Sequence, residues 1–197
     1  MKKTGLIVIV AIIILFSTNA AVLRAEEKAK PTTVEILNSE YTKPPDTNDN
    51  VEIDTASTVE NILKKTDYYY ATRNFDKAIE LCWLALTKTN DKLLIAKINF
   101  SLSSNYLEKG IEPYIKNKDD SFYKLSIESA KKCLEVMSDN WQALANLGSV
   151  YLNMRDWKQS VFYFSQAQKY LDKNDPVYAE IEFSRRAAEE MDKKSQN

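Results

Sequence analysis

The feature that most constrains the fold of this chain is a pattern of large and small residues that recurs three times after residue 56. In each stretch a tyrosine late in the first half is followed by a small residue late in the second half. These pairs are Tyr69 and Ala85, Tyr106 and Cys133, and Tyr151 and Ala167. The separation is 16 residues in the first and third stretches and 27 in the second, which therefore carries 11 additional residues. The pattern predicts three related helical pairs.

Small residues occupy matched positions in the three stretches. Two antiparallel helices approach closely only where side chains are small. The first halves offer, in order, Thr66, Ser103 and Gly148, and the second halves offer Ala78, Ser126 and Ser160. Large aromatic residues stand near the start of each second half, namely Phe75, Tyr123 and Trp157. This agreement predicts the same helix–helix contact in all three pairs.

The third stretch resembles the 34-residue tetratricopeptide (TPR) pattern, on the run from Trp141 through Leu147, Gly148 and Tyr151 to Asp156, Trp157 and Ala167. The resemblance covers about 120 of the 197 residues. It implies an all-α fold, a TPR-type α-solenoid of helix-turn-helix repeats that forms a short right-handed superhelix. The expected TPR domain spans 56–193, with repeats at about 59–92, 96–140 and 141–174, a capping helix over 176–193 and a tail over 194–197.

Local signals predict where the helices begin and end. Ser57 with Glu60 forms a capping-box pattern, and Asn74 and Asp156 suit helix N-caps. Gly110 suits a helix C-terminus, so we expect the extra residues of the second stretch to form an enlarged loop, Ile111–Ser121. Asp175 followed by Pro176 opens the expected seventh helix.

The N-terminal segment 1–23 has the pattern of a secretory signal peptide. Lys2 and Lys3 precede an apolar run from Leu6 to Phe16, and small residues follow it. A retained N-terminal anchor in the inner membrane is the alternative interpretation. Both interpretations predict export to the periplasm or another extracytoplasmic compartment. Residues 24–55 contain three prolines among polar and charged residues, which predicts a flexible linker.

Composition argues against several classes of function. The chain has no histidine, which removes the commonest general base and zinc ligand, and only three glycines, which disfavours a phosphate-binding loop. No cofactor and no metal site are expected, and the protein is not expected to be an enzyme. A net charge of −1 predicts no nucleic-acid partner. Cys82 and Cys133 fall on core positions of different repeats, so we expect two buried free thiols, although a disulfide is not excluded by sequence.

The TPR resemblance implies a partner-binding surface. In TPR proteins the first helix of each repeat lines a concave groove that takes a partner's peptide or helix. Carried over to this chain, the groove positions are Asp67, Tyr70, Lys97, Phe100, Ser104, Leu107, Gln142, Asn146, Ser149 and Asn153. The residues with which some family members clamp a C-terminal carboxylate are missing, because Leu63 and Asp67 stand in place of Lys and Asn, and Ser101 in place of Asn. In the third repeat Gln142 and Asn146 stand in place of basic residues.

The resulting expectation is a non-catalytic protein–protein interaction scaffold of the cell envelope that binds a partner segment in its concave groove. The alternative is a structural component of a larger envelope assembly, acting through repeat ends or the Ile111–Ser121 loop. Self-association through exposed repeat ends also stays open.

Overall fold

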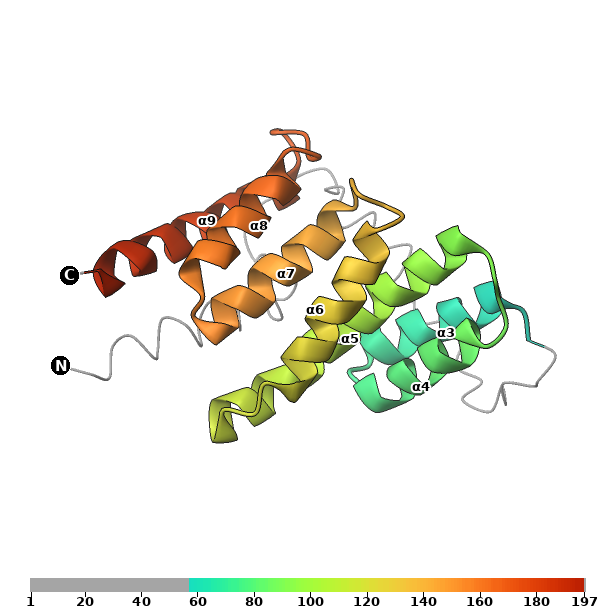
Figure 1. The fold of residues 1–197 in the computed structure, drawn as a ribbon. Coiled ribbons are helices and arrows are strands. Elements are labelled where there is room, and N and C mark those ends of the chain that lie inside the picture. Colours follow the sequence, from blue (N-terminus) through green and yellow to red (C-terminus); the bar gives the residue numbers. More distant parts are fainter. Residues whose placement is uncertain (1–56, 197) are drawn as a thin grey trace, which may run out of the picture.

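The computed structural model describes residues 57–196 and shows an all-α protein (Figure 1). This part of the chain forms seven helices and no strands, as the sequence predicts. The helices are α3 (Val59–Ala71), α4 (Phe75–Leu86), α5 (Lys92–Asn117), α6 (Ser121–Leu134), α7 (Trp141–Met154), α8 (Trp157–Gln168) and α9 (Pro176–Ser195). The predicted signal peptide or anchor and the predicted linker lie outside the described residues.

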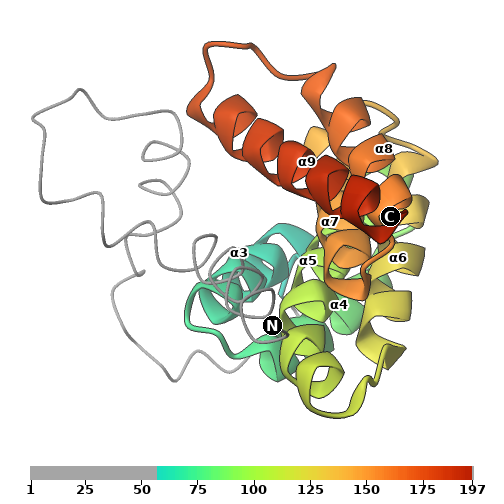
Figure 2. The same ribbon diagram turned by 90° about the vertical axis from the view of Figure 1, so that its left-hand side faces the viewer.

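Consecutive helices pack as pairs: α3 with α4, α5 with α6, and α7 with α8. Helix α9 packs on α8 and also touches α7 (Figure 2). The first helices of the pairs also meet, since α5 packs against α7 and, less extensively, against α3. No helix among residues 57–196 is both long and apolar enough to cross a membrane.

Predicted small residues lie where the two helices of the second and third pairs touch, whereas Thr66 of the first pair donates to the carbonyl oxygen of Ile62 in its own helix. Ser126 Oγ donates to the carbonyl oxygen of Ser103 at 2.8 Å, and Ser160 Oγ donates to that of Gly148 at 2.9 Å. A Cβ atom on Gly148 would lie 2.7 Å from the ring of Phe164, so a larger residue there would clash with buried atoms. The same contact thus joins residues 23 apart in the second pair and 12 apart in the third.

The prediction of an enlarged loop at Ile111–Ser121 is wrong. Helix α5 runs without a break to Asn117, past Gly110 and Pro113, and only residues 118–120 separate it from α6. Gly110 is buried, and a Cβ there would lie 2.7 Å from the Tyr123 ring, so this glycine permits close packing of α5 on α6 rather than ending a helix. The extra residues lengthen both helices, and their joined ends project past the neighbouring helices (Figure 1).

Apart from Gly110, the predicted helix ends are confirmed with one further correction. Asn74 and Asp156 cap α4 and α8 through their side-chain oxygens, and Asp175 caps α9 just before Pro176. The cap of α3 is Thr58 rather than Ser57, because Thr58 Oγ1 accepts the backbone N–H of Asn61 at 3.3 Å. Thr58 satisfies an N–H group that the first turn of a helix would otherwise leave unpaired.

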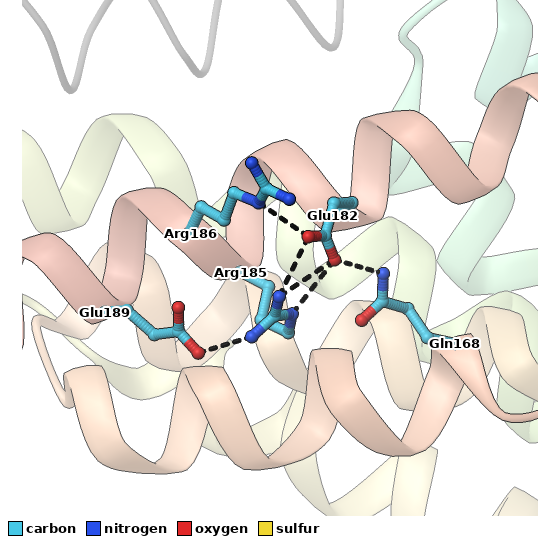
Figure 3. A network of polar contacts seen from close by, with 5 residues as sticks. All are labelled: Gln168, Glu182, Arg185, Arg186 and Glu189. Carbon is cyan, nitrogen blue, oxygen red and sulfur yellow. Dashed lines mark hydrogen bonds and ion pairs between the residues drawn. The ribbon is translucent and has the colours of Figure 1, made fainter.

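A polar network fastens α9 to α8 (Figure 3). Gln168 Nε2 of α8 donates to Glu182 Oε2 of α9 at 2.7 Å, and the same carboxylate binds Arg185 and Arg186. Arg185 also pairs with Glu189. The hydrogen bond from Gln168 and the guanidinium groups of Arg185 and Arg186 lower the pKa of Glu182 to about 2, because they favour the charged form, while burial acts in the opposite direction.

Candidate functional site

The ten predicted groove residues all lie on the first helices of the three pairs, and we call them together the first-helix face. Asp67 and Tyr70 lie on α3, the residues from Lys97 to Leu107 on α5, and those from Gln142 to Asn153 on α7. Because α5 packs against both neighbours, this face has two junctions, one between α3 and α5 and one between α5 and α7. The ten residues play different roles at these junctions.

At the α5–α7 junction, polar residues of the face bind each other. Asn146 Nδ2 donates to Ser104 Oγ at 2.9 Å and lies 3.4 Å from Ser103 Oγ. Ser104 Oγ in turn donates to the carbonyl oxygen of Phe100 at 3.3 Å. The amide of Asn146 therefore joins two helices and is not freely available to a partner.

Two further predicted residues serve packing at this junction. Leu107 is buried, only 8% exposed, in an apolar cluster with Tyr123 and Val150. Asn153 hydrogen-bonds to the hydroxyl of Tyr123, whose pKa is raised chiefly by burial. Leu107 and Asn153 thus hold α5, α6 and α7 together.

The α3–α5 junction contains carboxylates in a partly buried setting. Burial alone raises the pKa of Asp67 to about 6, and no hydrogen bond or ion pair to another described residue offsets that burial. Glu108 of α5 is also partly buried, and this raises its pKa, although Arg73 acts in the opposite direction. Arg73 Nη2 lies 3.8 Å from Glu108 Oε2, with the arginine side chain 60% exposed.

Tyr70 lies beside these charges. Its side chain is 39% exposed and its ring meets that of Phe75 edge to face, with ring centroids 5.9 Å apart. Burial and the neighbouring Glu108 carboxylate both raise the pKa of Tyr70. Tyr70 is therefore an ordered, partly accessible aromatic ring next to an acidic group.

A small polar cluster lies beneath this junction. The Cys82 thiol of α4 hydrogen-bonds to Ser101 and Thr66. Its pKa is raised to about 12, mainly by burial and to a smaller extent by the charge of Asp67. Asn105 Nδ2 donates to the carbonyl oxygen of Ser101 at 2.8 Å. Asn105 is completely buried, yet its Oδ1 has no hydrogen-bond partner among the described residues.

Sequence reasoning missed Asn105 and Glu108. Together with Ser101 they form a polar stripe along α5 at positions i, i+4 and i+7, which places them on one side of the helix. That stripe was visible in the sequence. The sequence did not show which helices the stripe faces, because the rotation of α5 about its axis depends on how its neighbours pack.

The remaining residues of the face have simpler settings. Lys97 is exposed, while Phe100, Gln142 and Ser149 are half-buried.

Cys82 and Cys133 are buried free thiols, as their core positions predict. Within residues 57–196 no group of three or more Cys, Asp or Glu side chains is arranged to hold a metal ion.

No protein-family model matches the chain, and no curated protein matches it.

Proposed function

We propose that this protein is a non-catalytic interaction scaffold built from three TPR-type helix pairs and a capping helix. The observation that carries the proposal is the repeated contact at the small residues, where Ser126 binds the carbonyl of Ser103 and Ser160 binds that of Gly148 in the same register. Repeat proteins place one supersecondary unit after another, so that each packs mainly on its neighbours. The contacts of α5 with both α3 and α7 support this arrangement.

The partner segment binds on the first-helix face. The most available part of that face combines the partly exposed rings of Tyr70 and Phe100 with polar groups of α3 and α5. Aromatic anchors beside hydrogen-bonding groups are typical of surfaces that bind an extended segment or an amphipathic helix. The N-terminal segment, with Lys2, Lys3 and the following apolar run, would deliver this scaffold to the cell envelope.

A crosslinked pull-down with the full chain tests the proposal. The native chain is compared with a Tyr70→Ala/Phe100→Ala variant, which we expect to lose the captured partner. The matched control is Leu125→Ala/Phe162→Ala, which removes two exposed apolar side chains from the second helices α6 and α8. Thermal unfolding of each variant separates lost binding from lost folding. Equal capture by both double variants would contradict the assignment to the first-helix face.

A second candidate is a structural role through the projecting ends of α5 and α6. Ile115 near this tip is 49% exposed. An Ile115→Lys variant keeps the helix but places a charge on the tip. Loss of the partner in this variant, with retention in Tyr70→Ala/Phe100→Ala, would favour the structural role over the scaffold.

A further inference from the structure

One side of helix α9 is left uncovered by the described helices. The buried residues of α9, which are Ile181, Ser184 and Ala188, lie on the opposite side, and α9 packs mainly on α8. Figure 2 looks onto α9 with no other helix drawn in front of it. The residues of the uncovered side are exposed or half-buried and recur at helical spacing. We call them the α9 stripe: Ala179, Glu180, Phe183, Arg186 and Ala187.

Phe183 stands at the centre of the α9 stripe. It is 57% exposed, the largest exposed fraction among the large apolar residues of 57–196. Ala179 lies one turn before it and Ala187 one turn after it. Two helices approach each other closely only where their side chains are small. The two alanines therefore leave room for a second helix to cover the phenyl ring.

Opposite charges flank Phe183 at equal spacing. Glu180 stands three residues before it and Arg186 three residues after it. Glu180 is exposed and makes no ion pair within the described residues. Arg186, whose side chain is 72% exposed, binds Glu182 through Nε and makes no bond to the described residues through its two terminal nitrogens. Both charged groups are thus available to a partner.

The α9 stripe complements a second copy of itself. If two α9 helices lie antiparallel with a two-fold axis at Phe183, each residue before Phe183 meets the residue at the same spacing after it in the other copy. Glu180 then meets Arg186 of the second copy, and the same pair forms again across the axis. Ala179 likewise meets Ala187, and the two Phe183 rings meet at the axis. A parallel pair would place like charges side by side, so the charges select the antiparallel arrangement.

We propose that two copies of this protein associate through the α9 stripe, as an antiparallel, two-fold symmetric helix pair centred on Phe183. This goes beyond the proposed function, because it assigns a second surface whose partner is another copy of the chain. Helix α9 has 20 residues, so the pair is about 30 Å long, a contact at the small end of the range for specific complexes. We therefore expect a dissociation constant on the order of 10 μM. Because α3 lies at the opposite end of the described helices from α9 (Figure 1), Tyr70 stays accessible in the pair.

Sedimentation of the full chain across a dilution series measures this association. Glu180→Arg sets arginine against arginine in the pair, and Arg186→Glu sets glutamate against glutamate. Each single variant should therefore associate about tenfold more weakly than the native chain. Mixed one to one, the two variants should associate again, because every arginine then meets a glutamate of the other copy. A general change in solubility would not produce this rescue.

Two further variants test the apolar centre of the contact. Phe183→Ala should weaken association, whereas Phe162→Ala, which removes a similarly exposed ring from α8, should leave it unchanged. Thermal unfolding identifies any variant that fails to fold. Arg186→Glu loses the bond to Glu182, whereas Glu180→Arg and Phe183→Ala break no side-chain bond of the described residues, so these two decide the test if Arg186→Glu is unfolded.

Three outcomes would overturn the proposal. The first is a native chain that stays monomeric up to about 100 μM, well above the expected dissociation constant. The second is association that Glu180→Arg and Phe183→Ala leave at its native strength, since it would then use another surface. The third is a mixture of the two folded charge variants that stays dissociated, which contradicts the antiparallel arrangement. The scaffold proposal is judged separately, because its pull-down variants lie on α3 and α5.

Discussion

The two junctions of the first-helix face contain similar residue types but pair them differently. At the α5–α7 junction the amide of Asn146 binds the hydroxyl of Ser104, and Leu107 fills the core beneath. At the α3–α5 junction Asp67 has no hydrogen-bond or ion-pair partner among the described residues, and the ion pair of Arg73 with Glu108 is 3.8 Å long with the arginine side chain 60% exposed. The polar groups of the α5–α7 junction are thus paired with each other, whereas those of the α3–α5 junction are paired weakly or not at all within the described residues.

This difference shows that two junctions on the same face can contribute differently to folding stability. Paired polar groups and buried apolar side chains stabilise the fold, whereas a partly buried carboxylate without a partner costs stability. Substitutions at the α5–α7 junction should therefore reduce folding stability. Substitutions at the α3–α5 junction should cost less stability, and removal of the Asp67 charge should raise it.

The largest expected loss of folding stability follows substitution of Leu107. Leu107→Ala should lower the free energy of unfolding by about 2–4 kcal/mol, because it leaves a cavity against Tyr123 and Val150. Tyr70→Ala, at the other junction, should cost about 1 kcal/mol or less, since its side chain is already 39% exposed. Urea unfolding of both variants measures the two values. Similar losses would show that the α3–α5 junction is as much a part of the core as the α5–α7 junction.

The next effect concerns the amide that joins α5 and α7. Asn146→Ala should lower stability by about 1–2 kcal/mol, because its hydrogen bond to Ser104 is lost in a partly buried place. Gln142→Ala is the control, because Gln142 lies one turn earlier on α7, is similarly half-buried and makes no hydrogen bond within the described chain. Thermal unfolding compares them, and an equal loss in both variants would show that the interhelical bond contributes little.

The helical pairs of this fold were predictable from sequence because their contacts are local and repeat. Small residues such as Ser103 and Gly148 mark where two helices touch, and that requirement can be read from residue type alone. The continuation of α5 to Asn117 was not predicted, because Gly110 and Pro113 usually signal the end of a helix. Here the ring of Tyr123 on α6 occupies the space that a side chain at Gly110 would need, so tertiary packing overrides the local signal.

The candidate site was predictable only in part, for a related reason. The repeat pattern places Asp67 and Tyr70 on the face, since position within a helix follows from spacing. Whether a side chain on that face is free depends on the neighbouring helices, and Leu107 is buried by residues of α6 and α7. The unpaired state of Asn105 could not be foreseen, because it depends on what the facing helix fails to supply.

A smaller effect of opposite sign is expected at Asp67. Its pKa is raised from 3.8 to about 6 in the folded protein, so folding favours the protonated form. The native protein thus has its full stability below about pH 4 and loses part of it as the pH rises through 6. Each pKa unit corresponds to about 1.4 kcal/mol, and water around this half-buried group reduces the total loss to about 1 kcal/mol.

Asp67→Asn should remove this loss. The variant should be about 1 kcal/mol more stable than the native protein at pH 7.5 and equal to it at pH 4. Unfolding in urea across this pH range measures the difference, with the exposed Asp139→Asn as the control. A variant less stable than the native protein at pH 7.5 would mean that Asp67 is paired in solution, and the comparison between the junctions would then fail.

The smallest change in folding stability is expected for substitution of Arg73. Its contact with Glu108 is 3.8 Å long and its side chain is 60% exposed, so Arg73→Gln should cost about 0.5 kcal/mol or less, and less still at high salt. Arg185 is the matched control, because its side chain is 21% exposed and it binds both Glu182 and Glu189 of α9. Arg185→Gln should lower the free energy of unfolding by about 1 kcal/mol. Unfolding at low and high salt measures both variants. If Arg73→Gln costs as much as Arg185→Gln, the ion pair of Arg73 with Glu108 stabilises the fold as much as the pairs of Arg185 do, and the expected difference in stability between the two junctions is wrong.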